Sequence, residues 1–218
     1  VAEAKLQEGT VYTVRRGEIR EINIAANTFV KGTGSGVAKL CYGPDFNEFL
    51  KQLVVAKQHG NAKDTVITKI SFLTNDQTVG TVKVSDVYSE YPVYASLVGT
   101  EVRITTPASS LKTGNGPAFM FYALSKLKTI EHLDVIDVSE GEDFSSMFNG
   151  CLELEAIDVS NFKTGNSLTF DAMFQDCMKA KTIDVSNFNT GKAISLDAIF
   201  KNCESVTELD VKDFDVSN

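Results

Sequence analysis

A repeat in the C-terminal half constrains the fold of this 218-residue chain more than any other feature. Its first motif occurs three times without gaps, at Met147–Cys151, Met173–Cys177 and Ile199–Cys203. A second motif follows each copy, at Ile157–Phe162, Ile183–Phe188 and Leu209–Phe214. A looser, earlier copy runs from Met120 to Val135. Regular recurrence of this kind is typical of chains built from stacked structural units.

Each copy has two halves with different hydrophobic spacing. The first half has apolar residues at i, i+3, i+4 and i+7, as in Phe144, Met147, Phe148 and Cys151, which is typical of one helix face. The second half fits a leucine-rich-repeat frame through Leu154, Ile157, Val159 and Phe162, which indicates a short strand. We therefore expect residues 116–218 to form a leucine-rich-repeat solenoid, an α/β fold of helix–strand units with a parallel sheet on one side.

The pattern MFxxCxxLxxIDVSNFxT at 147–164, and again at 173–190 with Ala180 in place of the leucine, resembles a known repeat. It is similar to the repeat of the BspA-like leucine-rich-repeat surface proteins, found mainly on bacterial cell surfaces and in some parasitic protists. The resemblance implies an extracellular or cell-surface location and a role in adhesion. Residues 94–106 resemble the lead-in strands of that family, and Leu124 departs from it where the other copies carry cysteine.

Residues 1–115 contain no repeat and are expected to form an α+β cap that covers the first repeat. Alternation and β-branched residues predict strands at 18–24, 66–73, 79–84, 93–98 and 101–105. An apolar stripe after Asp45 predicts a helix that ends near His59 and Gly60. Residues 107–117 have the composition of a loop, which places the domain boundary at 115/116.

Composition excludes several classes of partner. The net charge is −8, and no run of Lys or Arg exceeds two residues, so nucleic acid is not an expected partner. No apolar run approaches the roughly 18 residues that a membrane-spanning helix needs, so membrane insertion is not expected. The expected partner is a protein ligand, with a host surface protein as one candidate, and the oligomeric state stays open.

The three repeat cysteines, Cys151, Cys177 and Cys203, occupy one equivalent position. We expect them to form a buried column of small apolar side chains. Disulfides between neighbouring repeats and a metal site are the alternatives, although no C-x-x-C motif is present.

Lys31–Gly36 lacks the Gly-Lys-Ser/Thr of a phosphate loop and is expected to be a turn.

A column of aspartates is expected on the outward face of the repeat strands: Asp134, Asp158, Asp184 and Asp210. Neighbouring strands would place their carboxylates about 5 Å apart, so their mutual repulsion must be relieved. Splayed side chains, hydrogen bonds from serines, raised pKa values or a bound cation such as calcium could each do so. We expect no resident metal or cofactor, and a speculative binding face made of His132, Asp134, Asp158, Ser160, Asp184, Ser186 and Asp210.

Catalysis is not expected, and no catalytic residues are assigned. The chain has two histidines and no tryptophan, and His132 lies beside no evident nucleophile. The expected function is a non-catalytic cell-surface binding or adhesion module that presents its sheet face to a protein. The alternative is a structural spacer that displays another domain, and a glycan-processing enzyme comes a distant third.

Overall fold

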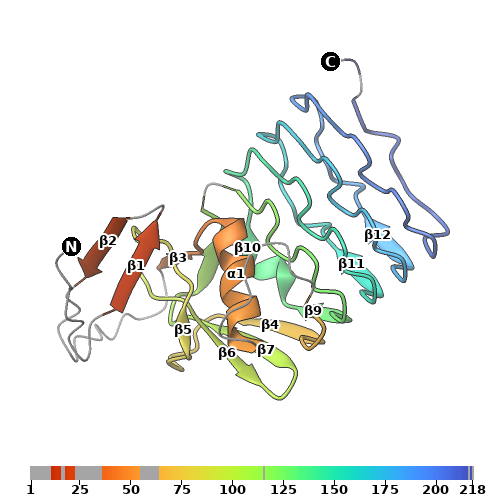
Figure 1. Ribbon diagram of the computed structural model, residues 1–218. Helices are drawn as coiled ribbons and strands as arrows, with labels where there is room; N and C mark the ends of the chain where they lie inside the picture. The colour runs from red at the N-terminus through yellow and green to blue at the C-terminus, as the bar shows by residue number, and fades with distance from the viewer. Residues whose placement is uncertain are drawn as a thin grey trace. The chain divides into compact units, whose positions relative to one another are not determined.

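Figure 1 shows the computed structural model, which describes residues 11–15, 18–22, 36–54, 64–114, 116–215 and 217. The chain divides into two compact units, residues 1–33 and 34–218. A single hydrophobic core in the second unit contains residues from both sides of position 115, such as Phe72 and Phe148. The expected division into 1–115 and 116–218 stays a prediction, and the two parts share this core.

The first unit contains a β-hairpin. β1 (Val11–Arg15) pairs antiparallel with β2 (Glu18–Ile22), and Val11 lies opposite Ile22. The expected strand at 18–24 is confirmed as far as Ile22, and its last two positions lie outside the described residues. Most of the glycine-rich segment at 31–36 also lies outside them.

A five-stranded sheet forms one side of the second unit. Its strand order is β5 (Val82–Lys83), β6 (Tyr94–Val98), β7 (Glu101–Thr105), β4 (Lys69–Leu73) and β9 (Thr129–Glu131). β6 and β7 form an antiparallel hairpin, whereas β4 runs parallel to both β7 and β9. Because side chains alternate along a strand, Ile70 and Phe72 of β4 and Val102 and Ile104 of β7 are buried, and Lys69, Ser71, Glu101 and Arg103 lie on the opposite face.

A smaller parallel sheet contains β3 (Val37–Lys39), β8 (Ser110–Lys112) and β10 (Ile136–Asp137). Leu111 of β8 lies in register between residues of β3 and β10 and is fully buried. The expected loop at 107–117 therefore contains a strand, because its one large apolar residue reaches the core.

The helix expected after Asp45 is confirmed as α1 (Gly43–Val54), with Asp45 in its first turn. Phe46 and Leu50 of its apolar stripe are fully buried. The expected end of the helix, with His59, lies outside the described residues. Asn47 joins α1 to the first repeat, because its side-chain amide donates hydrogen bonds to the carbonyls of Met120 and Tyr122.

The repeat region forms a series of loops that lie side by side (Figure 1). β11 (Ala156–Asp158) pairs in parallel with β12 (Thr182–Asp184), with Ile157 opposite Ile183 and Asp158 opposite Asp184. Turns at 118–123, 145–150, 171–176 and 197–202 precede the positions where strands were expected, and we call these the turn segments.

The predicted fold class is wrong. The described residues form several small sheets and one α-helix, α1, which lies outside the repeats. The segments expected to be helical in a leucine-rich-repeat solenoid are instead the turn segments. The strand halves are short: β9 and β10 in the first repeat, β11 in the second and β12 in the third, each of two or three residues.

Backbone hydrogen bonding explains why the turn segments are not helices. In the second repeat, alternate residues donate their N–H groups to carbonyls of the next repeat: Phe144 to Thr169, Ser146 to Asp171, Phe148 to Met173 and Gly150 to Gln175. The N–H groups of Met147, Asn149 and Cys151 close i→i−3 turns instead. Ser146 and Gly150 have positive φ, which a right-handed helix cannot accommodate.

Two columns of side chains pack between the repeats. Phe121, Phe148, Phe174 and Phe200 stack, with neighbouring ring centroids 5.3 to 5.6 Å apart. Cys151 and Cys177 are fully buried, Cys203 is half-buried, and all three are free thiols. Their sulfurs contact the carbonyls of Phe121, Phe148 and Phe174 at 3.1 to 3.3 Å. The expectation of a buried cysteine column is confirmed for Cys151 and Cys177, whereas Cys203 is half-buried.

This burial makes a prediction about thiol reactivity. Burial raises the pKa of Cys151 to about 12 and that of Cys203 to about 11, and it also raises the pKa of Cys177. Because the thiolate is the reactive species, Ellman's reagent at pH 8 should label Cys151 and Cys177 at least about 100-fold more slowly in the native protein than in urea. Mass spectrometry would assign each site. Equal native and denatured rates at Cys177 would contradict the buried column.

Candidate binding face and pocket

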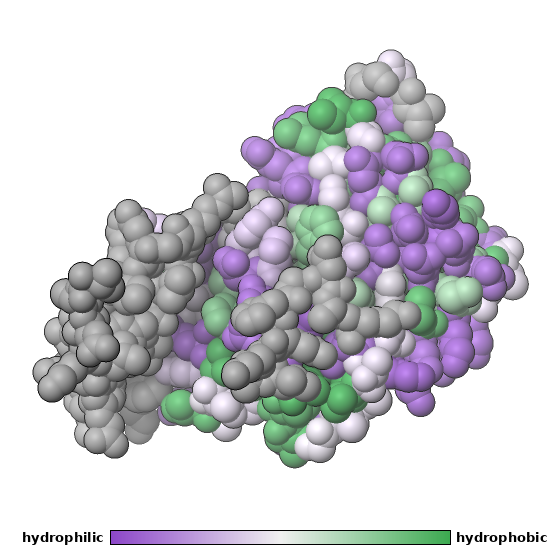
Figure 2. Space-filling view, in the orientation of Figure 1, coloured by the Kyte–Doolittle hydropathy of each residue, from purple (hydrophilic) through white to green (hydrophobic). Residues whose placement is uncertain are grey.

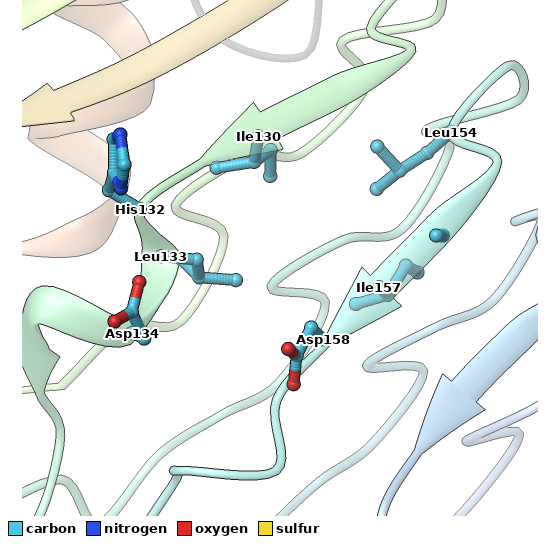
Figure 3. Close-up of a pocket in the computed structure, with 8 residues that line it drawn as sticks. Ile130, His132, Leu133, Asp134, Leu154, Ile157 and Asp158 are labelled. Atoms are coloured by element: carbon cyan, nitrogen blue, oxygen red, sulfur yellow. The ribbon is translucent and has the colours of Figure 1, made fainter.

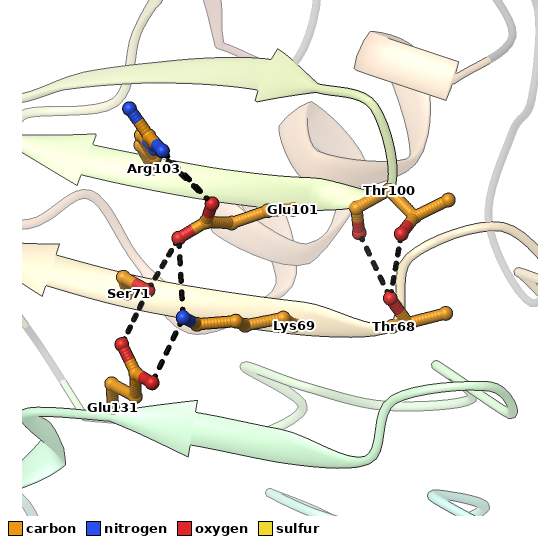
Figure 4. Close-up of polar contacts among 7 residues, drawn as sticks. All are labelled: Thr68, Lys69, Ser71, Thr100, Glu101, Arg103 and Glu131. Carbon is orange, nitrogen blue, oxygen red and sulfur yellow. Dashed lines mark hydrogen bonds and ion pairs between the residues drawn. The ribbon is translucent and has the colours of Figure 1, made fainter.

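Outward side chains of β4, β7 and β9 form a polar network on the five-stranded sheet (Figure 4). The Lys69 ammonium lies 2.8 Å from Glu131 and 3.6 Å from Glu101. Ser71 donates to both glutamates, and Arg103 donates to Glu101. The hydrogen bond with Lys69 lowers the pKa of Glu131, and the hydrogen bond from Ser71 lowers the pKa of Glu101. Both carboxylates are therefore held in their charged form at neutral pH.

The same outward face continues into the repeats. The N–H of Glu155 donates to Lys128, just before β9, and the N–H of Lys181 donates to Glu155 in the same way. These bonds place Ala156 and Asp158 of β11 beside β9, followed by Thr182 and Asp184 of β12, and all four side chains are exposed. We call the outward side chains of β4, β7, β9, β11 and β12 the binding face.

The expected aspartate column is only partly correct. Asp158 and Asp184 lie opposite each other in the β11–β12 register. Asp134 lies instead on a short 3-10 helix, η1 (Leu133–Val135), which follows β9. The bond between Glu155 and Lys128 puts Glu131, rather than Asp134, at the position equivalent to Asp158. The chain leaves β9 at His132, whose φ of 58° turns the backbone away from the strand direction.

Serines two residues downstream hydrogen-bond both column carboxylates. The Ser160 hydroxyl donates to Asp158 at 2.6 Å, and the Ser186 hydroxyl donates to Asp184 at 2.7 Å. The backbone N–H groups of the same serines donate to the same oxygens at 3.1 Å. These local bonds stabilise each charged carboxylate. Of the expected ways of relieving the repulsion between the aspartate carboxylates, the structure shows hydrogen bonds from serines.

Asp210 lies apart from this arrangement. It is exposed, belongs to no described strand, and pairs with Lys212 at 2.8 Å. The hydrogen bond from Lys212 lowers the pKa of Asp210. The structure therefore gives Asp210 a cationic neighbour in its own repeat, which Asp158 and Asp184 lack among the described residues.

A pocket of about 100 Å³ opens between η1 and β11 (Figure 3). Its lining residues are Ile130, His132, Leu133, Asp134, Leu154, Ala156, Ile157 and Asp158. His132 and Asp134 lie on one side of the opening and Asp158 lies on the other (Figure 3). The pocket thus combines an apolar lining with one imidazole and two carboxylates.

The structure brings three of the seven expected site residues, His132, Asp134 and Asp158, into this pocket. Ser160, Asp184 and Ser186 lie further along the same repeats, and Asp210 is separate. Sequence reasoning missed the apolar lining, because Ile130 and Leu154 were expected only as core residues. It also missed Lys69, Glu101 and Arg103, which the alternation of charged and apolar residues along β4 and β7 could have indicated.

The sequence left calcium open as a ligand of the aspartates. Among the described residues, no three His, Cys, Asp or Glu side chains are grouped so that they could hold a metal ion.

No helix in the described part of the chain is both long and apolar enough to cross a membrane.

Residues 118–218 match a family model described as "Mycoplasma protein of unknown function, DUF285". The matched segment begins in the first turn segment and covers the whole repeat region. No curated protein and no solved structure matches the chain. The chain is therefore similar to this family over its repeats, and the family's description assigns no activity.

Proposed function

We propose that this chain is a non-catalytic protein-binding module and that its ligand contacts the binding face. The observation that carries the proposal is the continuous row of outward polar side chains from the β4–β7–β9 network to the exposed Asp158 and Asp184. On the side seen in Figure 2, hydrophilic residues cover much of the repeat region and hydrophobic ones form separate groups. Such a surface suits a polar protein contact better than a large apolar interface.

The chemistry of the pocket supports binding over catalysis. Its lining contains no serine, threonine or cysteine that His132 could activate as a nucleophile. It also contains no aromatic ring other than the imidazole, whereas sugar-binding sites commonly use aromatic contacts. The resemblance to BspA-like surface proteins supports a location on the cell surface, where the module would act in adhesion.

A crosslinking experiment followed by an affinity comparison tests this function. A photo-crosslinking amino acid at Thr182, on the same strand of the binding face as Asp184, would capture the ligand on intact cells. The captured protein would then be purified and its Kd measured. Asp184→Lys should weaken binding at least about tenfold, because it reverses a charge on the face. Glu204→Lys makes the same charge change in a turn outside the face and should alter Kd less than about twofold.

Melting temperatures of both variants would be measured to confirm folding. Equal affinities of Asp184→Lys and Glu204→Lys for the captured protein would contradict the proposed function. That result would favour the spacer, since a spacer tolerates changes on its sheet face.

A further inference from the structure

The pocket exists because two neighbouring strands separate. β11 and β12 pair over three residues, but β9 and β11 belong to different sheets. Among the described residues, one backbone hydrogen bond, from Glu155 to Lys128 at 3.3 Å, joins the starts of β9 and β11. Beyond it, His132 and η1 turn the chain away from β11. The opening is therefore produced by the backbone and does not depend on the position of one side chain.

The lining divides into an apolar floor and an acidic rim. Leu133, Leu154 and Ile157 are at most 5% exposed, and Ile130 is half-buried beside them. Asp134 and Asp158 are both exposed at the opening (Figure 3). A ligand that enters would contact hydrocarbon at its inner end and meet carboxylates at the surface.

The two carboxylates at the rim, Asp134 and Asp158, differ from other acidic residues of the repeats in their ion pairing. Glu131 pairs with Lys69, and Asp210 pairs with Lys212. Within the described residues, no Lys or Arg forms an ion pair with Asp134 or Asp158. Ser160 donates to Oδ1 of Asp158, which leaves Oδ2 available. The pocket therefore carries two negative charges that the described part of the chain does not neutralise.

The size of the pocket narrows the class of ligand. Sites for small molecules usually enclose about 300–1,000 Å³. A volume of about 100 Å³ suits a single side chain of a partner protein. A side chain that matches an apolar floor and an acidic rim needs an aliphatic stem and a cationic head.

We infer that this pocket receives an arginine side chain of the partner protein. The guanidinium group has five N–H donors in one plane, so it can bind carboxylates on two sides of an opening. It also stacks on planar rings, and the His132 imidazole lies at the rim. Lysine has one compact, strongly hydrated ammonium and would bind less well. This inference rests on the proposed function, since it names the chemistry of the partner at the same face.

Methyl NMR of the full chain tests the inference with Nα-acetyl-arginine amide as the probe. The methyl signals of Ile130 and Ile157 should shift with a Kd in the millimolar range, as expected for one side chain. The lysine analogue should bind more weakly, and the neutral citrulline analogue should bind at least about fivefold more weakly than the arginine probe. Unchanged methyl signals up to 50 mM probe, or equal binding of citrulline, would overturn the inference.

Charge-neutralising variants separate the pocket from general acidity. Asp158→Asn keeps an acceptor for Ser160 but removes the charge, and it should weaken the arginine probe at least about threefold. Asp210→Asn removes a charge outside the pocket and should leave Kd unchanged. Equal effects of the two variants would show non-specific attraction and overturn the inference. If the probe fails while Asp184→Lys still weakens the captured partner, the arginine assignment fails and the proposed function stands.

Discussion

Replacing Phe174 by alanine should destabilise the protein by about 3–5 kcal/mol. Phe174 is fully buried, and its ring lies between those of Phe148 and Phe200, with centroids 5.6 Å from each and planes within 8° of parallel. Alanine would leave a cavity between two repeats that are held in place by backbone hydrogen bonds on either side. The site therefore has little freedom to collapse, which makes the cavity costly.

Urea and thermal unfolding would measure this effect. A loss of 3–5 kcal/mol corresponds to a fall of about 6–20 °C in Tm for a chain of this size. Met178→Ala is the matched control, because Met178 belongs to the same repeat but is 37% exposed. It should cost less than about 1 kcal/mol. Comparable losses in the two variants would contradict the stacked phenylalanine column.

The burial pattern of the repeats could be predicted from sequence, whereas their backbone conformation could not. Phe144, Met147, Phe148 and Cys151 were expected to point inward, and all are fully buried. Their spacing was interpreted as a helix face. Consecutive i→i−3 turns also direct these four side chains to one side of the chain, so the spacing does not distinguish such turns from a helix. The deciding factor is the donation of alternate N–H groups to the next repeat, which is a tertiary interaction.

The register of the first repeat shows a second limit. The motif Ile-Asp-Val-Ser occurs at 136–139, 157–160 and 183–186. In the structure, β11 and β12 pair through the second and third copies, but β10 pairs with β8. β9 takes the position next to β11 although its sequence, Thr-Ile-Glu, lacks the motif. Motif identity therefore did not determine which residues are neighbours in space, and Asp134 was placed in the wrong row.

Only the part of the candidate site that lies on regular strands could be predicted from the sequence. Asp158 and Asp184 follow from strict alternation in a regular strand, which sequence shows directly. The pocket depends on the left-handed backbone at His132 and on the separation of β9 from β11. Neither feature can be read from the sequence alone: histidine is several-fold enriched at positive φ, but most histidines have negative φ, so the residue type does not mark this backbone turn.

Asp64→Ala should cost about 3 kcal/mol, although sequence reasoning did not single out this residue. Asp64 is fully buried, and its Oδ2 accepts hydrogen bonds from the N–H groups of Val66 and Ile67 at 3.2 and 2.8 Å. Its backbone also pairs with the first repeat around Leu124, since its N–H donates to Ala123 and its carbonyl accepts from Ser125. Alanine would leave the buried Ile67 N–H without its partner, where a hydrogen bond to a charged acceptor contributes about 1.5–3 kcal/mol.

Two further variants distinguish hydrogen bonding from loss of side-chain volume. Asp64→Asn retains an oxygen acceptor and should cost clearly less than Asp64→Ala. Asp76→Ala removes a comparable bond to the N–H of Thr78, but at an exposed site where water replaces the acceptor, so its cost should stay below about 1 kcal/mol. Equal costs for Asp64→Ala and Asp76→Ala in urea unfolding would contradict a buried structural role for Asp64. A larger cost for Asp64→Ala than for Asp76→Ala would instead mean that Asp64 fixes the chain before β4 against the first repeat. Because β4 pairs with β9, this contact also helps to hold the β4–β7 part of the binding face in register with β9.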